Sequence, residues 1–280
     1  MSAASLTPPV PSSYAAALAS IAAARPDLSA AFDGLGAGAR LSDLAADGAV
    51  LDRWLAAETA LTPGLDGKAA AAFLTGRIAH AVCGVLVSLR FAAGAVPDLH
   101  PVDVALVREP HRWTVGALSG VTDRYALRFA ADRAETTPAA DDPGAALRLT
   151  LDRLHRPLVD ALAARRLLGR AALWRIVSDA VASAYLDAGR RAGREDAART
   201  EALAILRCAG CPLANRQTSF VRVESGCACA AEWFVSRGGC CRWYTVPGQE
   251  PCATCVLREP EDVEARLRAL LDARAASATA

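Results

Sequence analysis

Eight of the nine cysteines in this chain fall between residues 208 and 255, and the last four form the pattern C-C-x10-C-x2-C. These four are Cys240, Cys241, Cys252 and Cys255. Clustered thiols of this kind form disulfides, bind zinc or hold an iron–sulfur cluster. A chain of 280 residues buries enough core to fold without covalent links, and an odd number of cysteines argues against a closed disulfide framework. A metal centre is therefore the favoured interpretation.

The spacing bears on which metal this quartet binds. Cys252 and Cys255 form a C-x2-C knuckle like those of zinc ribbons, but Cys240 and Cys241 are adjacent. Two adjacent thiolates converge poorly on one small tetrahedral ion. A [2Fe-2S] cluster takes four thiolates, two for each iron, and is a wider target. The pattern favours the cluster, and it leaves zinc open.

A second quartet lies upstream, with the spacing C-x2-C-x15-C-x-C. It consists of Cys208, Cys211, Cys227 and Cys229. This spacing approaches that of a zinc ribbon, so a zinc ion that braces the segment is one hypothesis and a second cluster is another. Free cysteine also packs as a small hydrophobic residue, so four buried thiols without metal are equally compatible with the pattern.

The elements that must position these cysteines are mainly helical. Apolar periodicity and capping residues predict helices at 13–25, 42–60, 66–93, 147–168, 171–191 and 261–275, with Asp142-Pro143 as a helix start. Between 102 and 131 short apolar runs alternate with polar residues, which predicts two or three antiparallel strands. The expected fold is α+β, with helices around a small central antiparallel sheet and a C-terminal cysteine-rich loop docked on the helices.

Three regions are predicted along the chain. Residues 1–12 are rich in serine and proline and are expected to be disordered. Residues 13–200 form a mainly helical scaffold or substrate-binding domain, and residues 201–280 form the cysteine-rich region that ends in a helix. The glycine-rich segment 32–40 lacks a phosphate-binding motif and is interpreted as a connector.

Composition narrows the class of partner. The formal net charge is +1 and no basic block is present, so nucleic acid is not an expected partner. The N-terminus lacks a secretory pattern. The apolar run 78–95 is interrupted by His80 and Arg90, which favours a buried helix over a membrane span. A cytoplasmic protein is therefore expected. No dinucleotide or flavin motif is apparent, so any electron must come from another protein.

The string RGGCCRWY at residues 237–244, followed after the ten-residue spacer by CATC, resembles the C-terminal signature of the FhuF-like ferric siderophore reductases. The turn Val246–Gly248 inside the spacer also resembles that family. The segment LWRIVSDAVASA at 173–184 is similar to the tryptophan-bearing helix that precedes the cluster loop in those proteins. The resemblance is strongest over the last part of the chain and weakest over the first 140 residues.

This resemblance implies that Cys240, Cys241, Cys252 and Cys255 hold a [2Fe-2S] cluster. It further implies a cytoplasmic oxidoreductase that reduces a ferric siderophore by one electron and releases Fe(II). The electron donor would be a flavoprotein reductase or a ferredoxin. The upstream quartet is not part of the family pattern.

Residues beside the ligands have two possible roles. Arg237, Arg242, Trp243 and Tyr244 either contact the chelate or a redox partner, or shield the cluster from water. Backbone N–H groups of Gly238, Gly239 and Gly248 are candidate donors to the cluster sulfurs. The alternative to a reductase is a binding or interaction module that zinc or an iron–sulfur cluster stabilises, without turnover.

Overall fold

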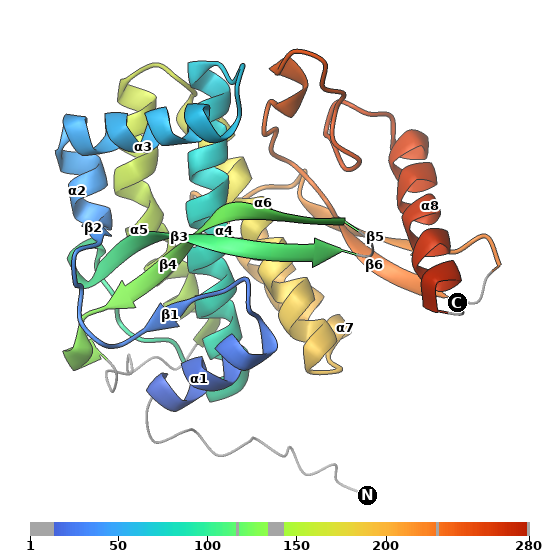
Figure 1. Ribbon diagram of the computed structural model, residues 1–280. Coiled ribbons are helices and arrows are strands. Elements are labelled where there is room, and N and C mark those ends of the chain that lie inside the picture. The colour runs from blue at the N-terminus through green and yellow to red at the C-terminus, as the bar shows by residue number, and fades with distance from the viewer. Residues whose placement is uncertain (1–13, 116–117, 134–142, 228–229, 279–280) are drawn as a thin grey trace, which may run out of the picture.

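The structure, a computed structural model, describes residues 14–115, 118–133, 143–227 and 230–278 (Figure 1). The expected disorder of residues 1–12 and the capping role of Asp142 fall outside these ranges. The fold class is confirmed as α+β and mainly helical.

The helices are α1 (Tyr14–Ala24), α2 (Leu41–Ala46), α3 (Gly48–Leu61), α4 (Gly67–Ala93), α5 (Pro143–Ala164), α6 (Arg170–Arg191), α7 (Glu195–Leu206) and α8 (Pro260–Ala278). The strands are β1 (Ala30–Ala31), β2 (Ala39–Arg40), β3 (Val104–Val115), β4 (Leu118–Phe129), β5 (Ser219–Glu224) and β6 (Ala231–Ser236).

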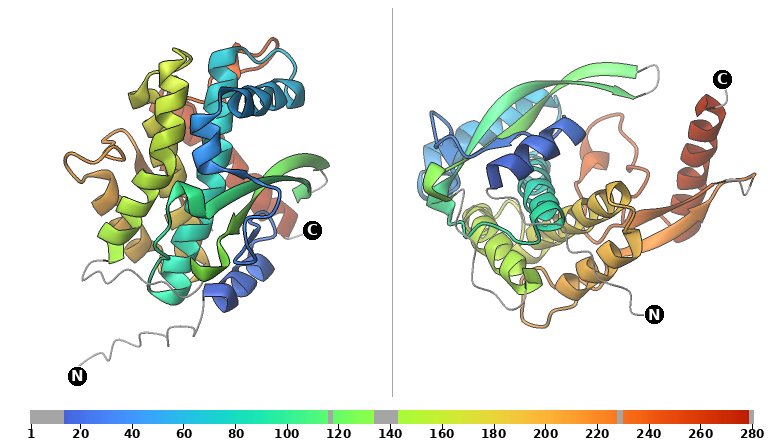
Figure 2. Two further views of the ribbon diagram at one scale, coloured as in Figure 1. Left: turned by 90° about the vertical axis from the view of Figure 1, so that its left-hand side faces the viewer. Right: turned by 90° about the horizontal axis from the view of Figure 1, so that it is seen from below.

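Helix α4 occupies the centre of the core. The side chain of Asp66 caps its first turn by accepting from the N–H of Ala69 at 2.6 Å, and Gly94 ends it in the left-handed conformation. Most residues of the helix are buried, which suits a position surrounded by other elements. Helices α1, α3, α5 and α6 and strand β4 pack around it (Figure 2).

Helix α4 is also long and apolar enough to cross a membrane. However, 78% of its most apolar window is buried inside the fold. The structure thus gives the apolar run at 78–95 the buried position that its interruption by His80 and Arg90 predicted.

The first sheet has the strand order β1-β4-β3-β2. Strands β3 and β4 pair in an antiparallel hairpin over twelve residues each, as expected for the 102–131 segment. At one edge of this sheet β1, which lies outside the predicted 102–131 segment, runs parallel to β4. The glycine-rich connector joins β1 to β2, which lies on the opposite edge. Strands of two residues carry no alternation, so sequence patterns do not reveal them.

The helix expected over 42–60 is two helices. Asp47 ends α2 and caps α3, where its carboxylate accepts from the N–H of Ala49 at 2.8 Å. A local side-chain bond to the backbone therefore interrupts an otherwise continuous apolar pattern.

The C-terminal region lies on one side of the helical core (Figure 1). It contains an unpredicted hairpin of β5 and β6, which contacts α6 through β6. Helix α8 covers β5, where Val223, Leu267 and Leu271 form a small apolar cluster. The domain division at residue 200 remains a prediction, and this residue lies inside α7.

Candidate metal centre

The four predicted ligands lie in two loops that the C-terminal hairpin and helix bring together. Cys240 and Cys241 follow β6, and Cys252 and Cys255 precede α8. All four are free thiols; Cys255 is buried and the other three are half-buried. The loops thus place the thiols at an edge of the fold where part of the site faces solvent.

The thiols approach one another in pairs. Cys240 is hydrogen-bonded to Cys255, and Cys241 to Cys252. Burial raises the pKa of Cys240, whereas the hydrogen bond from Cys252 lowers the pKa of Cys241 to about 5. Within the described ranges, no three His, Cys, Asp or Glu side chains converge closely enough to hold a single metal ion. Four thiols in two pairs fit a dinuclear iron–sulfur cluster better than one tetrahedral ion.

Two backbone N–H groups point at ligand sulfurs. The N–H of Arg242 donates to the Sγ of Cys240 at 3.4 Å, and the N–H of Trp243 donates to Cys241. Arg242 has a left-handed backbone with φ of 62°, which continues into the 3-10 helix Trp243–Thr245. Hydrogen bonds to cluster sulfurs help to set the reduction potential. Sequence reasoning had proposed glycine N–H groups for this role and missed these two.

The N–H groups of Gly238 and Gly239 instead bind Asp179 of α6. Its carboxylate accepts from Gly238 at 2.8 Å, from Gly239 at 2.9 Å and from the hydroxyl of Thr218 at 2.7 Å. Asp179 is 5% exposed, and burial raises its pKa although these donors act in the opposite direction. Asp179 therefore fixes the backbone immediately before the first two ligands to the helical core.

Close packing explains the two glycines at this point. A Cβ on Gly239 would lie 2.8 Å from the backbone nitrogen of Ile176 and 2.9 Å from the carbonyl carbon of Arg175. A Cβ on Gly238 would lie 2.5 Å from the amide of Asn215. Gly239 thus lets the segment after β6 touch the backbone of α6, and Gly238 lets the same segment approach Asn215 and Thr218.

We expect Gly239→Ala to destabilise the protein by about 1–3 kcal/mol, because the added methyl group meets backbone that cannot rotate away. The iron content per chain should fall together with the stability, because a displacement of residue 239 also displaces the adjacent Cys240. Gly169→Ala is the matched control, because no atom lies within 4 Å of the Cβ it would add. Denaturant unfolding and iron analysis measure both effects. Equal stability and iron content in the two variants would contradict this packing argument.

Arg237 joins Asp179 to a ligand. Its Nε lies 3.3 Å from the carboxylate of Asp179, and its Nη1 donates to the Sγ of Cys252 at 3.6 Å. The side chain is 23% exposed. A positive charge beside a thiolate favours the state of a bound cluster that carries one more electron. This guanidinium therefore contacts a predicted ligand, and its contact to substrate or partner stays a prediction.

Arg237→Gln is expected to lower the midpoint reduction potential of the iron–sulfur protein. A hydrogen bond from a charged donor contributes about 1.5–3 kcal/mol. Because a tenfold change in an equilibrium constant corresponds to about 59 mV for one electron, the expected fall in potential is roughly 65–130 mV. Arg242→Gln is the control, because that guanidinium pairs with Asp66 at 3.3 Å while the backbone N–H to Cys240 is retained. A redox titration that finds the same potential for wild type and Arg237→Gln would refute the electrostatic role.

The other three flanking residues differ in exposure. The side chain of Arg242 faces Asp66, the cap of α4. Trp243 packs against Phe73 of α4 with ring centroids 5.9 Å apart, beside the buried Val246. Tyr244 is 38% exposed. Arg242 and Trp243 therefore attach the first cysteine loop to α4, and Tyr244 alone of these three presents a large exposed surface.

Arg258 holds the second cysteine loop and was not predicted. It donates to the carbonyl of Cys252 at 3.0 Å and to the carbonyl of Pro251, and pairs with Asp262 at 2.6 Å. The N–H of Cys255 closes the C-x2-C turn on the carbonyl of Cys252 at 3.0 Å. In the sequence, the one sign that Arg258 belongs to the site is its position three residues after Cys255.

The structure does not assemble the upstream quartet as a metal site. Cys208 and Cys211 are free thiols in the turn after α7. Cys227 is disulfide-bonded, so it offers no thiolate, and Cys229 lies outside the described residues. The hypothesis of zinc at this quartet gains no support from the part of the chain that the structure describes.

Four thiols in two neighbouring loops, with backbone N–H groups directed at two of their sulfurs, are the arrangement expected of an iron–sulfur site. The family model described as "Ferric iron reductase FhuF-like transporter" matches residues 74–222, just over half of the chain. A second model, the FhuF 2Fe-2S C-terminal domain, matches residues 237–257 and spans all four ligands. The chain belongs to the FhuF-like ferric iron reductase family. A search of curated proteins finds no match.

Proposed function

We propose that this protein is a cytoplasmic ferric siderophore reductase that passes one electron to a bound Fe(III) chelate and releases Fe(II). The observation that carries the proposal is the thiol quartet of Cys240, Cys241, Cys252 and Cys255 at a partly exposed edge of the fold, in a member of a ferric iron reductase family. When bound, a [2Fe-2S] cluster supplies a one-electron couple.

The chemistry of the substrate explains why one electron is sufficient. Siderophores hold Fe(III) through hard oxygen donors, and such donors bind the softer Fe(II) more weakly. One electron from the protein converts Fe(III) to Fe(II), and the oxygen ligands then take up protons as the metal leaves. No general acid or base is required of the protein for the electron-transfer step.

The residues of this chain contribute position and potential. Asp179 and Arg258 fix the two cysteine loops, and Arg237 places positive charge beside Cys252. The half-buried position of three thiols allows a chelate or a donor protein to approach within a short distance, which electron transfer needs because its rate falls steeply with separation. The donor in this proposal is a flavoprotein reductase or a ferredoxin, since the sequence shows no dinucleotide or flavin motif.

The proposal is tested with the purified protein, a ferredoxin and its NADPH-dependent reductase as donor, and a ferric siderophore. We expect Fe(II), trapped by a coloured ferrous chelator, to form faster than with donor alone. The Cys252→Ala variant, which loses a ligand, should add nothing to the donor-only rate. Equal rates with wild type, Cys252→Ala and donor alone, for hydroxamate, catecholate and carboxylate complexes, would reject the reductase and favour a binding module without turnover.

A further inference from the structure

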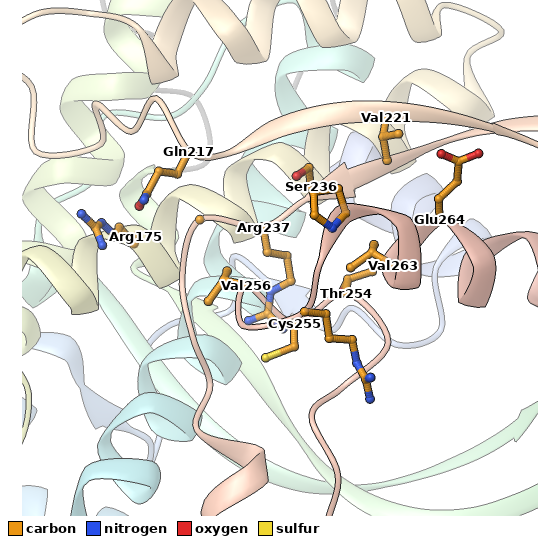
Figure 3. Close-up of a pocket in the computed structure, with 13 residues that line it drawn as sticks. Arg175, Gln217, Val221, Ser236, Arg237, Thr254, Cys255, Val256, Val263 and Glu264 are labelled. Atoms are coloured by element: carbon orange, nitrogen blue, oxygen red, sulfur yellow. The ribbon is translucent and has the colours of Figure 1, made fainter.

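A groove of about 400 Å³ opens directly beside the thiol quartet. Helix α6, the ends of β5 and β6, the second cysteine loop and the start of α8 form its walls. Its volume lies within the range of small-molecule sites. Figure 3 shows Cys255 and Arg237 directed into the space between Arg175 on one side and Val263 and Glu264 on the other. A ligand in this groove would lie next to a ligand residue of the metal centre.

The groove offers hydrogen-bond donors that the protein itself does not use. Arg175 is exposed and, among the described residues, has no ion-pair partner. In the same described part of the chain, the side chains of Gln217 and Thr254 make no hydrogen bond to protein groups. Val221, Val256 and Val263 provide apolar wall between these donors. This combination suits an oxygen-rich molecule with a carbon framework.

Charge distinguishes the guanidiniums along the groove. Arg237 is paired with Asp179 and Arg258 with Asp262, whereas no carboxylate of the described residues forms an ion pair with Arg175. A [2Fe-2S] centre with four thiolates carries net negative charge, so it repels anions that approach it. A free arginine at the entrance offsets this repulsion and binds carboxylate or phenolate oxygens in a fork.

We propose that this groove is the site of the iron substrate and that Arg175 selects ferric chelates of net negative charge, such as catecholate or carboxylate complexes, over neutral hydroxamate complexes. This inference rests on the proposed function and adds to it the location and the charge class of the substrate. In the bound complex the chelate lies in the groove that Cys255 lines, beside the second cysteine loop, which brings the electron acceptor close to the thiol quartet. The step remains the reduction of chelated Fe(III) to Fe(II) by one electron.

The test measures binding separately from reduction. Gallium(III) complexes have the charge and shape of the ferric complexes but do not accept the electron. Isothermal titration calorimetry of the iron-loaded protein with a Ga(III) tris-catecholate and a neutral Ga(III) tris-hydroxamate gives the two dissociation constants. We expect wild type to bind the anionic complex more tightly.

Two variants and one control make the test specific. Arg175→Gln should raise Kd for the anionic complex roughly fivefold and leave Kd for the neutral complex within about twofold. Glu264→Gln, which removes a negative charge from the opposite wall and releases Arg268 from its ion pair with Glu264, should lower Kd for the anionic complex. Arg53→Gln is the control, because Arg53 is exposed on α3, outside the groove. It should leave both constants unchanged.

Several outcomes would overturn the assignment. These are no binding of either gallium complex to wild type, equal changes in the two constants with Arg175→Gln, or a change only in the rate at which the donor protein reduces the iron–sulfur protein. The last result would assign the groove to the donor. If the gallium complexes bind as expected but ferric complexes are never reduced, the groove is supported as a binding site and the reductase proposal fails.

Discussion

Alanine at any one of Cys240, Cys241, Cys252 and Cys255 is expected to abolish nearly all bound iron and acid-labile sulfide. A [2Fe-2S] cluster needs four thiolates, two for each iron, and these four lie together in two hydrogen-bonded pairs. A methyl group supplies no ligand and leaves an iron exposed to solvent. Iron and sulfide analysis with the visible spectrum measures the loss in protein purified without oxygen.

Cys208→Ala is the matched control for these variants. Cys208 is also a free cysteine of the same region, but it lies in the turn after α7, apart from the quartet. We expect wild-type iron and sulfide in this variant. If Cys208→Ala loses iron while Cys240→Ala or Cys241→Ala retains it, the ligands are exchanged between the two quartets and the assignment made here is wrong.

Asp179→Ala should have the largest effect of any substitution outside the ligands. The carboxylate accepts from two buried backbone N–H groups, from Thr218 and from Arg237. Each buried donor left without an acceptor costs about 1–3 kcal/mol, so we expect a loss of stability of roughly 3 kcal/mol or more. The first cysteine loop should then separate from α6, and bound iron should be lost on buffer exchange.

Two further variants separate this role from a general effect of removing a carboxylate. Asp160→Ala removes a carboxylate that is 43% exposed on α5 and paired with Arg170, so it should change stability by less than about 1 kcal/mol. Asp179→Asn retains one carbonyl acceptor and should have an intermediate effect. Denaturant unfolding followed by circular dichroism compares the three. If the Asp179→Ala variant is as stable as wild type and binds as much iron, Asp179 does not support the cysteine loop.

The sequence predicted the parts of this site whose chemistry is local. Cysteine spacing and the RGGCCRWY string predicted four ligands and the family; the family models confirm the family, and the ligand assignment stays a prediction. Capping residues gave helix starts, such as Asp66 before α4 and Pro143 at the start of α5. The β3–β4 hairpin followed from alternation of apolar and polar residues. Each of these signals acts over a few neighbouring residues.

The sequence could not predict contacts between distant segments. Asp179 lies 59 residues before Gly238, and its position in an apolar helix gives no sign that it faces the cysteine loop. The chemical types of Arg237 and Trp243 left two roles open, contact to a substrate or partner and shielding of the cluster, and did not show that Arg237 reaches Cys252 or that Trp243 packs on Phe73. The packing of α4, α6 and the β5–β6 hairpin determines which side of the first cysteine loop is exposed to solvent.

The most direct test of the reductase proposal is a single-turnover measurement. Iron–sulfur protein reduced with half a mole of dithionite per mole of protein, which supplies one electron for each cluster, is mixed without oxygen with a ferric siderophore, and the visible spectrum is followed by stopped flow while Fe(II) is trapped. We predict that the oxidised spectrum returns within seconds of mixing. About one Fe(II) should form for each molecule of [2Fe-2S] protein. A protein that stays reduced in the presence of every class of ferric siderophore, and forms no Fe(II), would contradict it.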